Sequence, residues 1–174
     1  MKLSGRKASQ RFSIVIMRQF ASILALQVLV NAGIPQSRPD AEAMPRKFLV
    51  ALNGFMGAGK GVLLENGALV YTTYGANGAK QRKEIRPTPE QWRRFRQALD
   101  AINIWRWRAD YPNPGVADGL RWEIDLVYAD RTVHAAGANN YPDDTGRPTG
   151  SPKTSKAFDR LSAAVQELLG DSSF

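Results

Sequence analysis

The strongest constraint on the fold is a strict alternation of side chains over residues 120–128. Apolar residues occupy every second position, and the positions between them hold Arg121, Glu123, Asp125 and Val127. A period of two sends alternate side chains to opposite faces of a β-strand, so this segment predicts a strand with one buried face and one mostly wet face. Such strands are typical of antiparallel sheets that are covered on one side only.

Further strands are expected on both sides of this one. Short apolar runs predict strands at 48–52, 62–65, 68–71 and 132–138, and a more polar run predicts an edge strand at 80–86. Asn66-Gly67 separates two of these runs. This pair favours the type I′ turn of a hairpin, because that turn needs positive φ at both central residues.

Two helices are predicted, each with a clear start. Thr88, Pro89 and Gln91 form a capping box with proline at the first helical position. The apolar stripe that follows consists of Trp92, Phe95, Leu99 and Ile102. Ser155 can cap the second helix, and Gly170 can end it. The order of these elements predicts an α+β fold: a two-layer sandwich with an antiparallel sheet of about five strands and two helices on one face.

The first 32 residues predict an export signal. They carry five basic residues and no acidic one, and their apolar run at 20–30 is too short to span a bilayer. Val30-Asn31-Ala32 offers small residues for signal peptidase. The expected organisation is a signal peptide at 1–32, a flexible proline-containing tether at 33–46 and one domain at 47–170. A buried helix over 12–30, a retained membrane anchor and a start at Met17 are the alternatives.

Net charge and cysteine content limit the possible partners and the cellular location of the chain. The chain has 24 Lys and Arg against 16 Asp and Glu, but removing residues 1–32 leaves 19 basic against 16 acidic residues. The basic excess therefore belongs mostly to the signal, and nucleic acid is not a favoured partner. The chain has no cysteine, which excludes disulfides, thiolate metal sites and lipoprotein attachment. A periplasmic or secreted location is expected, with membrane contact only through an uncleaved signal segment.

One glycine-rich string resembles a P-loop, and its letters resemble those of shikimate kinases. Residues 54–61 read GFMGAGKG, with Lys60 at the phosphate-binding position. A P-loop needs a following helix and a Ser or Thr after the lysine. Gly61 stands in place of the hydroxyl residue, and the following residues read as a hairpin. We therefore expect a loop between strands and no cofactor, and keep nucleotide binding by Gly54–Lys60 as an alternative.

A second alternative is a hydrolase of envelope carbohydrate. Glu123 and Asp125 lie two residues apart on one strand face, about 7 Å from each other, which is a spacing that an inverting glycosidase can use. The simpler interpretation of these two carboxylates is a solvated face of the sheet without catalytic function. His134 is the single histidine, and we expect it on a strand without catalytic partners. Asp143-Asp144 lacks the spacing of a calcium loop. No catalytic residue and no metal ligand is assigned.

Alternating indole and guanidinium groups suggest a surface for a macromolecular partner. Trp105-Arg106-Trp107-Arg108 has the composition of interface hot spots, although the tryptophans can instead anchor the helix end in the core. The predicted partner-binding residues are Trp105, Arg106, Trp107, Arg108, Tyr111, Asn139 and Tyr141.

Two motifs resemble a known group of domains. Asp118-Gly119 followed by Trp122 and Ile124, and then the stretch 137–142 (GANNYP) before an amphipathic helix, resemble uncharacterised secreted or lipoprotein domains of bacteria. The resemblance covers residues 48–170 as a pattern of strands and turns, and this chain differs in lacking the lipoprotein cysteine. It implies a βββαββα fold and a location in the cell envelope, but no activity. Because the sequence contains no nucleophile–base set, metal cluster or complete cofactor fingerprint, we expect an exported, non-enzymatic module that recognises a protein or an envelope polymer. It could be inhibitor-like, immunity-like or an envelope accessory factor.

Overall fold

The computed structural model describes residues 43–54, 57–75, 77–78, 80–115, 119–170 and 174, all within the unit Arg38–Phe174. The predicted signal peptide at 1–32 lies outside the described residues. In chain order the elements are β1 (Lys47–Asn53), β2 (Gly59–Glu65), β3 (Ala68–Tyr74), β4 (Lys80–Ile85), α2 (Pro89–Ala101), the short 3₁₀ helix η2 (Ile104–Arg106), β5 (Asp110–Tyr111), β6 (Arg121–Val127), β7 (Thr132–Ala138) and α3 (Lys156–Leu169). The described part therefore has an α+β fold, as predicted.

The strands form one sheet in the order β4-β3-β2-β1-β6-β7-β5. All neighbouring pairs are antiparallel except β5 and β7, which run parallel. The sheet thus has seven strands in place of the expected five or so. One strand that the sequence did not predict is β5, because a strand of two residues is too short to show a period of two.

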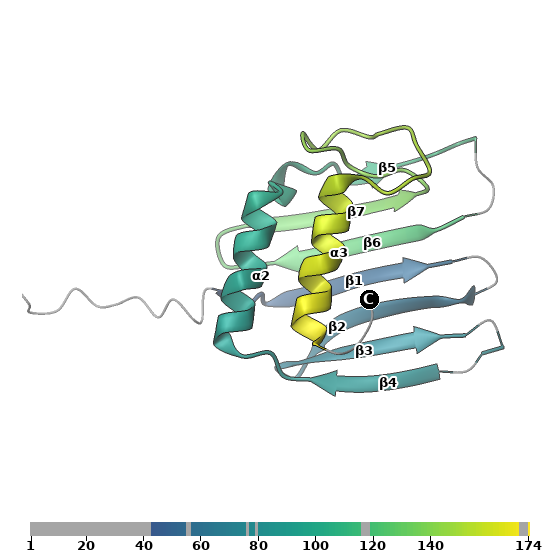
Figure 1. Cartoon of the computed structure of the whole chain (residues 1–174). Coiled ribbons are helices and arrows are strands. Elements are labelled where there is room, and N and C mark those ends of the chain that lie inside the picture. Colours follow the sequence, from purple (N-terminus) through teal and green to yellow (C-terminus); the bar gives the residue numbers. More distant parts are fainter. Residues whose placement is uncertain (1–42, 55–56, 76, 79, 116–118, 171–173) are drawn as a thin grey trace, which may run out of the picture. The chain divides into compact units, whose positions relative to one another are not determined.

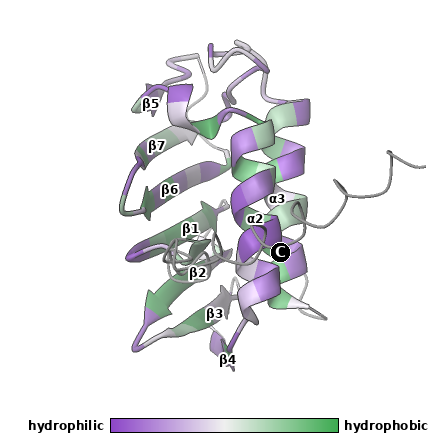
Figure 2. Cartoon of the chain, turned by 90° about the vertical axis from the view of Figure 1, so that its left-hand side faces the viewer, coloured by the Kyte–Doolittle hydropathy of each residue, from purple (hydrophilic) through white to green (hydrophobic). Residues whose placement is uncertain are grey.

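The two helices lie beside each other on one side of the sheet. Figure 1 shows α2 and α3 in front of the strands, and Figure 2 shows the same two layers after a quarter turn. Gln91 and Arg94 of α2 both bond to Glu167 of α3, the first to its backbone oxygen and the second to its carboxylate at 2.6 Å. We call the sheet face toward the helices the inner face, and the other the open face.

The register assigns each strand residue to one of these faces. Val50 lies opposite Val62 on one side and Ile124 on the other, and all three are buried on the inner face. The neighbouring position, Leu49, lies opposite Leu63 and Asp125 on the open face. The alternation predicted for residues 120–128 is therefore present, with Trp122, Ile124 and Leu126 buried.

The hairpin turn and the two helix caps predicted from the sequence are present in the structure. Asn66 and Gly67 adopt φ of 49° and 77°, as a type I′ turn requires. At α2, the Thr88 side chain accepts a hydrogen bond from the Gln91 backbone and the Thr88 backbone donates to the Gln91 side chain at 2.8 Å. The Ser155 hydroxyl accepts from the Phe158 backbone at 3.1 Å at the start of α3.

The core contains two aromatic clusters between the layers. One joins Phe48 of β1 to the α2 stripe, with ring centroids 5.4 Å from Phe95 and 6.0 Å from Trp92. The other cluster surrounds Trp122 and is described below. Two residues of the segment 33–46 that the sequence predicts as a tether pack on the domain: Ala43 is buried and Met44 contacts the core. The residues of this segment up to 42 lie outside the described part.

Candidate functional site

The residues predicted to bind a partner do not form one exposed surface. Trp107, Tyr111 and Tyr141 are buried, with 7% or less of each residue exposed. They surround Trp122: the ring centroids of Tyr111 and Trp107 lie 5.3 Å and 6.3 Å from it, and the Tyr141 ring stacks on it at 6.3 Å. These three rings are therefore part of the core, and Trp107 takes the alternative position in which a tryptophan anchors the helix end. Arg106 and Arg108 are exposed.

Hydrogen bonds explain why two of these polar rings tolerate burial. The Tyr111 hydroxyl accepts from the Arg108 backbone N–H and donates to the Gly146 oxygen, both at 2.8 Å. The Trp122 indole donates to the Asn140 oxygen at 2.9 Å. Burial raises the pKa of Tyr111, so the phenol stays a neutral donor.

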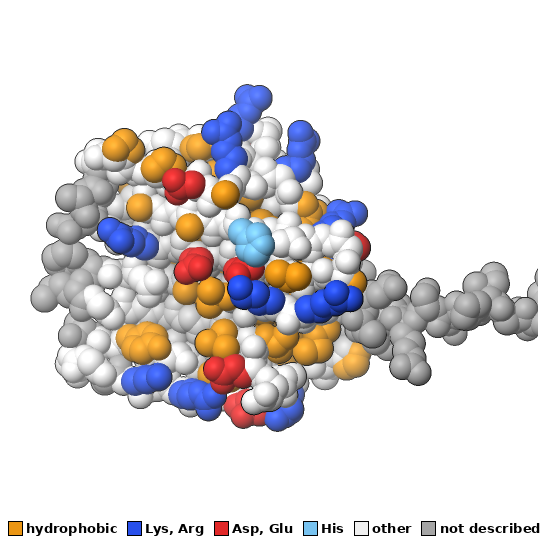
Figure 3. Space-filling view, turned by 180° about the vertical axis from the view of Figure 1, so that it is seen from behind, with side chains coloured by type: hydrophobic (Ala, Val, Ile, Leu, Met, Phe, Trp, Pro, Cys, Tyr) orange, Lys and Arg blue, Asp and Glu red, His pale blue; other side chains and the backbone are white. Residues whose placement is uncertain are grey.

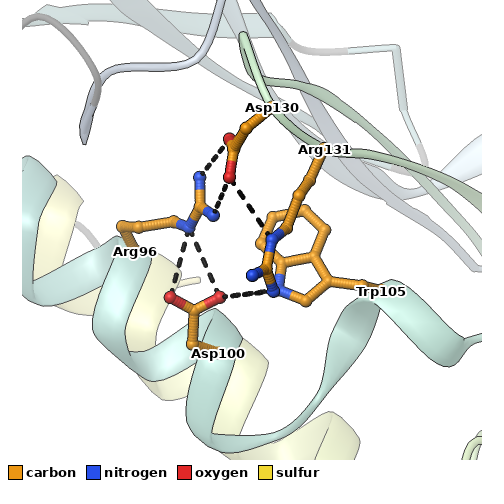
Figure 4. Close-up of polar contacts among 5 residues, drawn as sticks. All are labelled: Arg96, Asp100, Trp105, Asp130 and Arg131. Atoms are coloured by element: carbon orange, nitrogen blue, oxygen red, sulfur yellow. Dashed lines mark hydrogen bonds and ion pairs between the residues drawn. The ribbon is translucent and has the colours of Figure 1, made fainter.

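Trp105 belongs to a charged network at the end of α2 (Figure 4). Its indole N–H donates to the Asp100 carboxylate at 2.6 Å, and the guanidinium of Arg96 lies 4.7 Å from the centroid of its ring. The same guanidinium lies 4.6 Å from the Tyr128 ring and reaches both carboxylate oxygens of Asp130, at 3.0 and 2.8 Å. The side chain of Arg96 is only 15% exposed.

This network joins the helix layer to the turn between β6 and β7. A hydrogen bond from Arg96 lowers the pKa of Asp130 from 3.8 to about 2. Arg131 adds contacts to Asp130 at 3.3 Å and to Asp100 at 3.5 Å. Because the four charged side chains pair with one another and the Trp105 indole donates to one of them, we interpret Trp105 as part of a structural clamp.

The two motifs of the resemblance hold each other in place. A Cβ at Gly137 would lie 2.5 Å from the Trp122 ring, and a Cβ at Gly119 would lie 1.6 Å from the side chain of Asn139. The Asn139 side chain accepts from the Leu120 backbone at 2.9 Å. Both glycines therefore leave space for a partner from the other motif. Asn139 was predicted to bind a partner. In the structure it has a left-handed φ of 46°, and its side chain holds the backbone before β6.

The glycine-rich string is a turn between strands. Gly54 N–H donates to the Ala58 oxygen at 2.7 Å, and Lys60 lies inside β2, with Leu52 and Thr73 as its cross-strand partners. Residues 55–56 lie outside the described part. The Lys60 ammonium sits 5.1 Å from the Phe174 ring centroid, and burial lowers its pKa. The helix that a P-loop needs after its lysine is a strand here.

Glu123 and Asp125 share the open face but not a site. The Asp125 side chain is 12% exposed and forms an ion pair with Lys47, and its Oδ1 lies 2.7 Å from Nδ1 of His134. His134 is the direct cross-strand partner of Asp125 and is well exposed. Glu123 shares neither of these contacts, and it has no ion pair within the described part.

Glu123 lines a pocket of about 470 Å³ on the open face, and Asp125 does not. Its other charged lining residues are Asp110 and Arg121, and Ala136 and Ala138 are among its small residues. Asp110 and Glu123 flank Ala136, which pairs with both in the register. Their Cα atoms are therefore about 10 Å apart, two strand spacings. Within the described residues, neither carboxylate has an ion pair, and sequence reasoning missed Asp110 because β5 was not predicted.

The open face as a whole combines apolar and charged side chains (Figure 3). Leu49, Ala51 and Leu63 lie half-buried on β1 and β2, and Tyr74 of β3 is 43% exposed. Charged residues lie on both sides of them, including the Lys47–Asp125 pair and the Arg82–Glu65 pair, the latter at 2.7 Å. An apolar centre with a polar margin is the usual anatomy of a protein–protein interface.

Comparisons with known proteins add no relative: no family model matches the chain, and no curated protein sequence matches it. Among the described residues, no helix is long and apolar enough to cross a membrane. The same residues contain no group of three or more His, Asp or Glu side chains arranged to hold a metal ion.

Proposed function

We propose that this chain is an exported, non-enzymatic module that binds a protein partner through the open face of its sheet. The observation that carries the proposal is the apolar character of both faces of β1, which Leu63 of β2 extends on the open face. Antiparallel strands with one wet face normally alternate apolar and polar residues, whereas continuous apolar runs are typical of strands covered on both faces. In β1 the run from Phe48 to Leu52 is continuous.

The helices cover only one of these faces. Leu49, Ala51 and Leu63 on the open face are consequently the residues with most to gain from a partner. Beside the leucines, Lys47 and Glu65 pair with Asp125 and Arg82 within the chain. Glu123 next to Ala51 has no ion pair in the described part, so a suitable partner brings a cation to this position. The hydrolase alternative lacks a cleft shared by Glu123 and Asp125, and the nucleotide alternative lacks the helix after Lys60.

The experiment compares capture by three forms of the purified protein from envelope extracts. Leu63→Lys places a charge at the centre of the open face, and Gln97→Lys places the same charge on the exposed surface of α2. We expect a defined protein to be retained by wild type and by Gln97→Lys and lost with Leu63→Lys. Circular dichroism establishes that all three are folded. Equal retention by both variants would refute the open face as the binding surface.

Export is tested separately on the protein as the cell makes it. The signal at 1–32 predicts a mature chain that begins at Gly33. Intact-mass measurement of the periplasmic or secreted fraction should find this species. A chain that retains Met1 and stays in the cytoplasm would refute export and leave the binding surface to be judged on the capture result.

A further inference from the structure

We propose that the partner of the open face is a second copy of this chain, bound face to face about a twofold axis that runs along the seam between β1 and β2. This inference rests on the proposed function, since it names the occupant of the same surface. Cross-strand partners on the open face form rows that run across the sheet, and we call these register rows. Rotation about an axis parallel to the strands keeps a residue in its row and exchanges the two sides of the seam.

At the axis, the rotation brings apolar residues together. Leu49 and Leu63 are cross-strand partners on the two sides of the seam. Each therefore lies over the other type of leucine in the second copy, and four leucines meet. The next rows contain Ala51 with Gly61 and Asn53 with Gly59. These small side chains allow the sheets to approach to the usual spacing of about 10 Å.

Charges beside the axis are complementary under the same rotation. Continuing the β1–β2 register by two residues places Lys47 in the row of Glu65. Lys47 of each copy then lies over Glu65 of the second copy. Both side chains are accessible, since they are 59% and 44% exposed. Each keeps its contact within its own chain, to Asp125 and Arg82 respectively, so the pairing extends two existing ion pairs into a network.

The pocket supplies an independent match farther from the axis. Its two carboxylates, Asp110 and Glu123, have no ion pair in the described part of one chain. The rotation places β4 of the second copy over β7, and β4 carries Lys80 on its open-face side beside Arg82, which stays paired with Glu65 of its own chain. Cations of the second copy thus arrive at the end of the face where carboxylates lack a partner.

The competing twofold axis, perpendicular to the strands, is unfavourable. Placed midway between the rows of Leu49 and Ala51, it would exchange these two rows within each strand and place Glu123 over Asp125 of the second copy. Like charges that face each other directly are destabilising. The charge pattern therefore selects the axis along the β1–β2 seam. Because twisted sheets pack at about 30° to each other, the match is closest near the axis, where the leucines and the Lys47–Glu65 pairs lie.

The face is large enough for a stable dimer. The six strands from β4 to β7 span about 25 Å at the usual strand spacing, and strands of this length are about 23 Å long. The footprint is roughly 600 Å² per copy, or roughly 1,200 Å² in total, which exceeds the lower limit for a specific interface.

The experiment measures the oligomeric state and the orientation of the copies. Sedimentation equilibrium of the purified protein should show a dimer, and Leu63→Lys should raise its dissociation constant by at least about tenfold, as expected for the centre of an interface. Gln97→Lys should leave the constant unchanged. Since the chain has no cysteine, single-cysteine variants report the geometry: Leu63→Cys should form a covalent dimer with a short bismaleimide, whereas Lys80→Cys, far from the axis, and Gln97→Cys should not.

Three results would overturn the inference. They are a monomer at all concentrations, a dimer that Leu63→Lys does not weaken, and cross-linking that is equal at Leu63→Cys and Lys80→Cys. A monomeric protein whose capture of a different partner depends on Leu63 would overturn the second copy as occupant but keep the proposed function. A monomer whose capture is indifferent to Leu63 would overturn both.

Discussion

Replacing Arg96 by alanine should destabilise this protein far more than replacing a surface arginine on the same helix. The guanidinium of Arg96 packs against the rings of both Trp105 and Tyr128, which also contact each other, and it forms a two-pronged contact with Asp130. Each partly desolvated cation–π contact contributes about 1 kcal/mol. The pair with Asp130 contributes about 1 kcal/mol more, since the carboxylate is 55% exposed and its attraction is screened by water. The expected cost of Arg96→Ala is therefore about 3 kcal/mol.

The matched control is Arg93→Ala, three residues earlier on α2. Arg93 is 43% exposed and pairs with Glu90 on the helix surface, so its loss should cost about 0.5 kcal/mol or less. Arg96→Lys should fall between the two, at about 1.5 kcal/mol, because lysine keeps the charge but not the planar fork that contacts both rings and Asp130.

Urea unfolding followed by tryptophan fluorescence measures all three free energies. Repeating the measurement in 1 M salt, where the Debye length falls to about 3 Å, separates the contributions. We expect the ring contacts to keep Arg96→Ala about 2 kcal/mol below wild type at high salt. If Arg96→Ala costs no more than Arg93→Ala, the clamp between α2 and the β6–β7 turn contributes nothing, and the reasoning from its geometry is wrong.

The remaining predictions concern the cap, the pH dependence and the glycine-rich string. Thr88→Ala should cost about 1 kcal/mol of unfolding free energy because it removes the helix cap, and Phe95→Ala about 3–5 kcal/mol because it leaves a cavity; urea melts that reverse this order would contradict the placement of the buried stripe. The pKa of Asp130 is lowered from 3.8 to about 2 in the folded protein, so its contribution is complete above about pH 4 and lost as the pH falls toward 2; Asp130→Asn should flatten this part of the stability profile, and an unchanged profile would argue against the pairing. Calorimetry should find no Mg²⁺-dependent ATP binding that Lys60→Ala removes, since Lys60 lies within a strand whose N–H groups serve the sheet.

Structural elements that depend on a few neighbouring residues could be predicted from the sequence. The alternation over 120–128, the Asn66-Gly67 turn and the capping box at Thr88 each depend on the conformational preferences of a few neighbouring residues, and each appears in the structure where the sequence predicts it. The same locality explains why the string could be told from a P-loop, because the hairpin pattern after it outweighs the resemblance of its letters. The loop was expected to include Lys60, which lies in β2 because the strand begins at Gly59.

Which residues lie in the core and which lie close together in space could not be predicted, because both depend on contacts between distant elements. The stretch of residues 105–108 reads equally well as surface or core, because two tryptophans and two arginines satisfy either; the ring of Trp122 and the guanidinium of Arg96, from other elements, resolve it. Asp110 meets Glu123 only because two residues of β5 pair with β7. The leucines of the open face are apolar in the sequence, but only the register shows that Leu49 and Leu63 face away from the helices, since a strand's two faces are distinguished by what covers them.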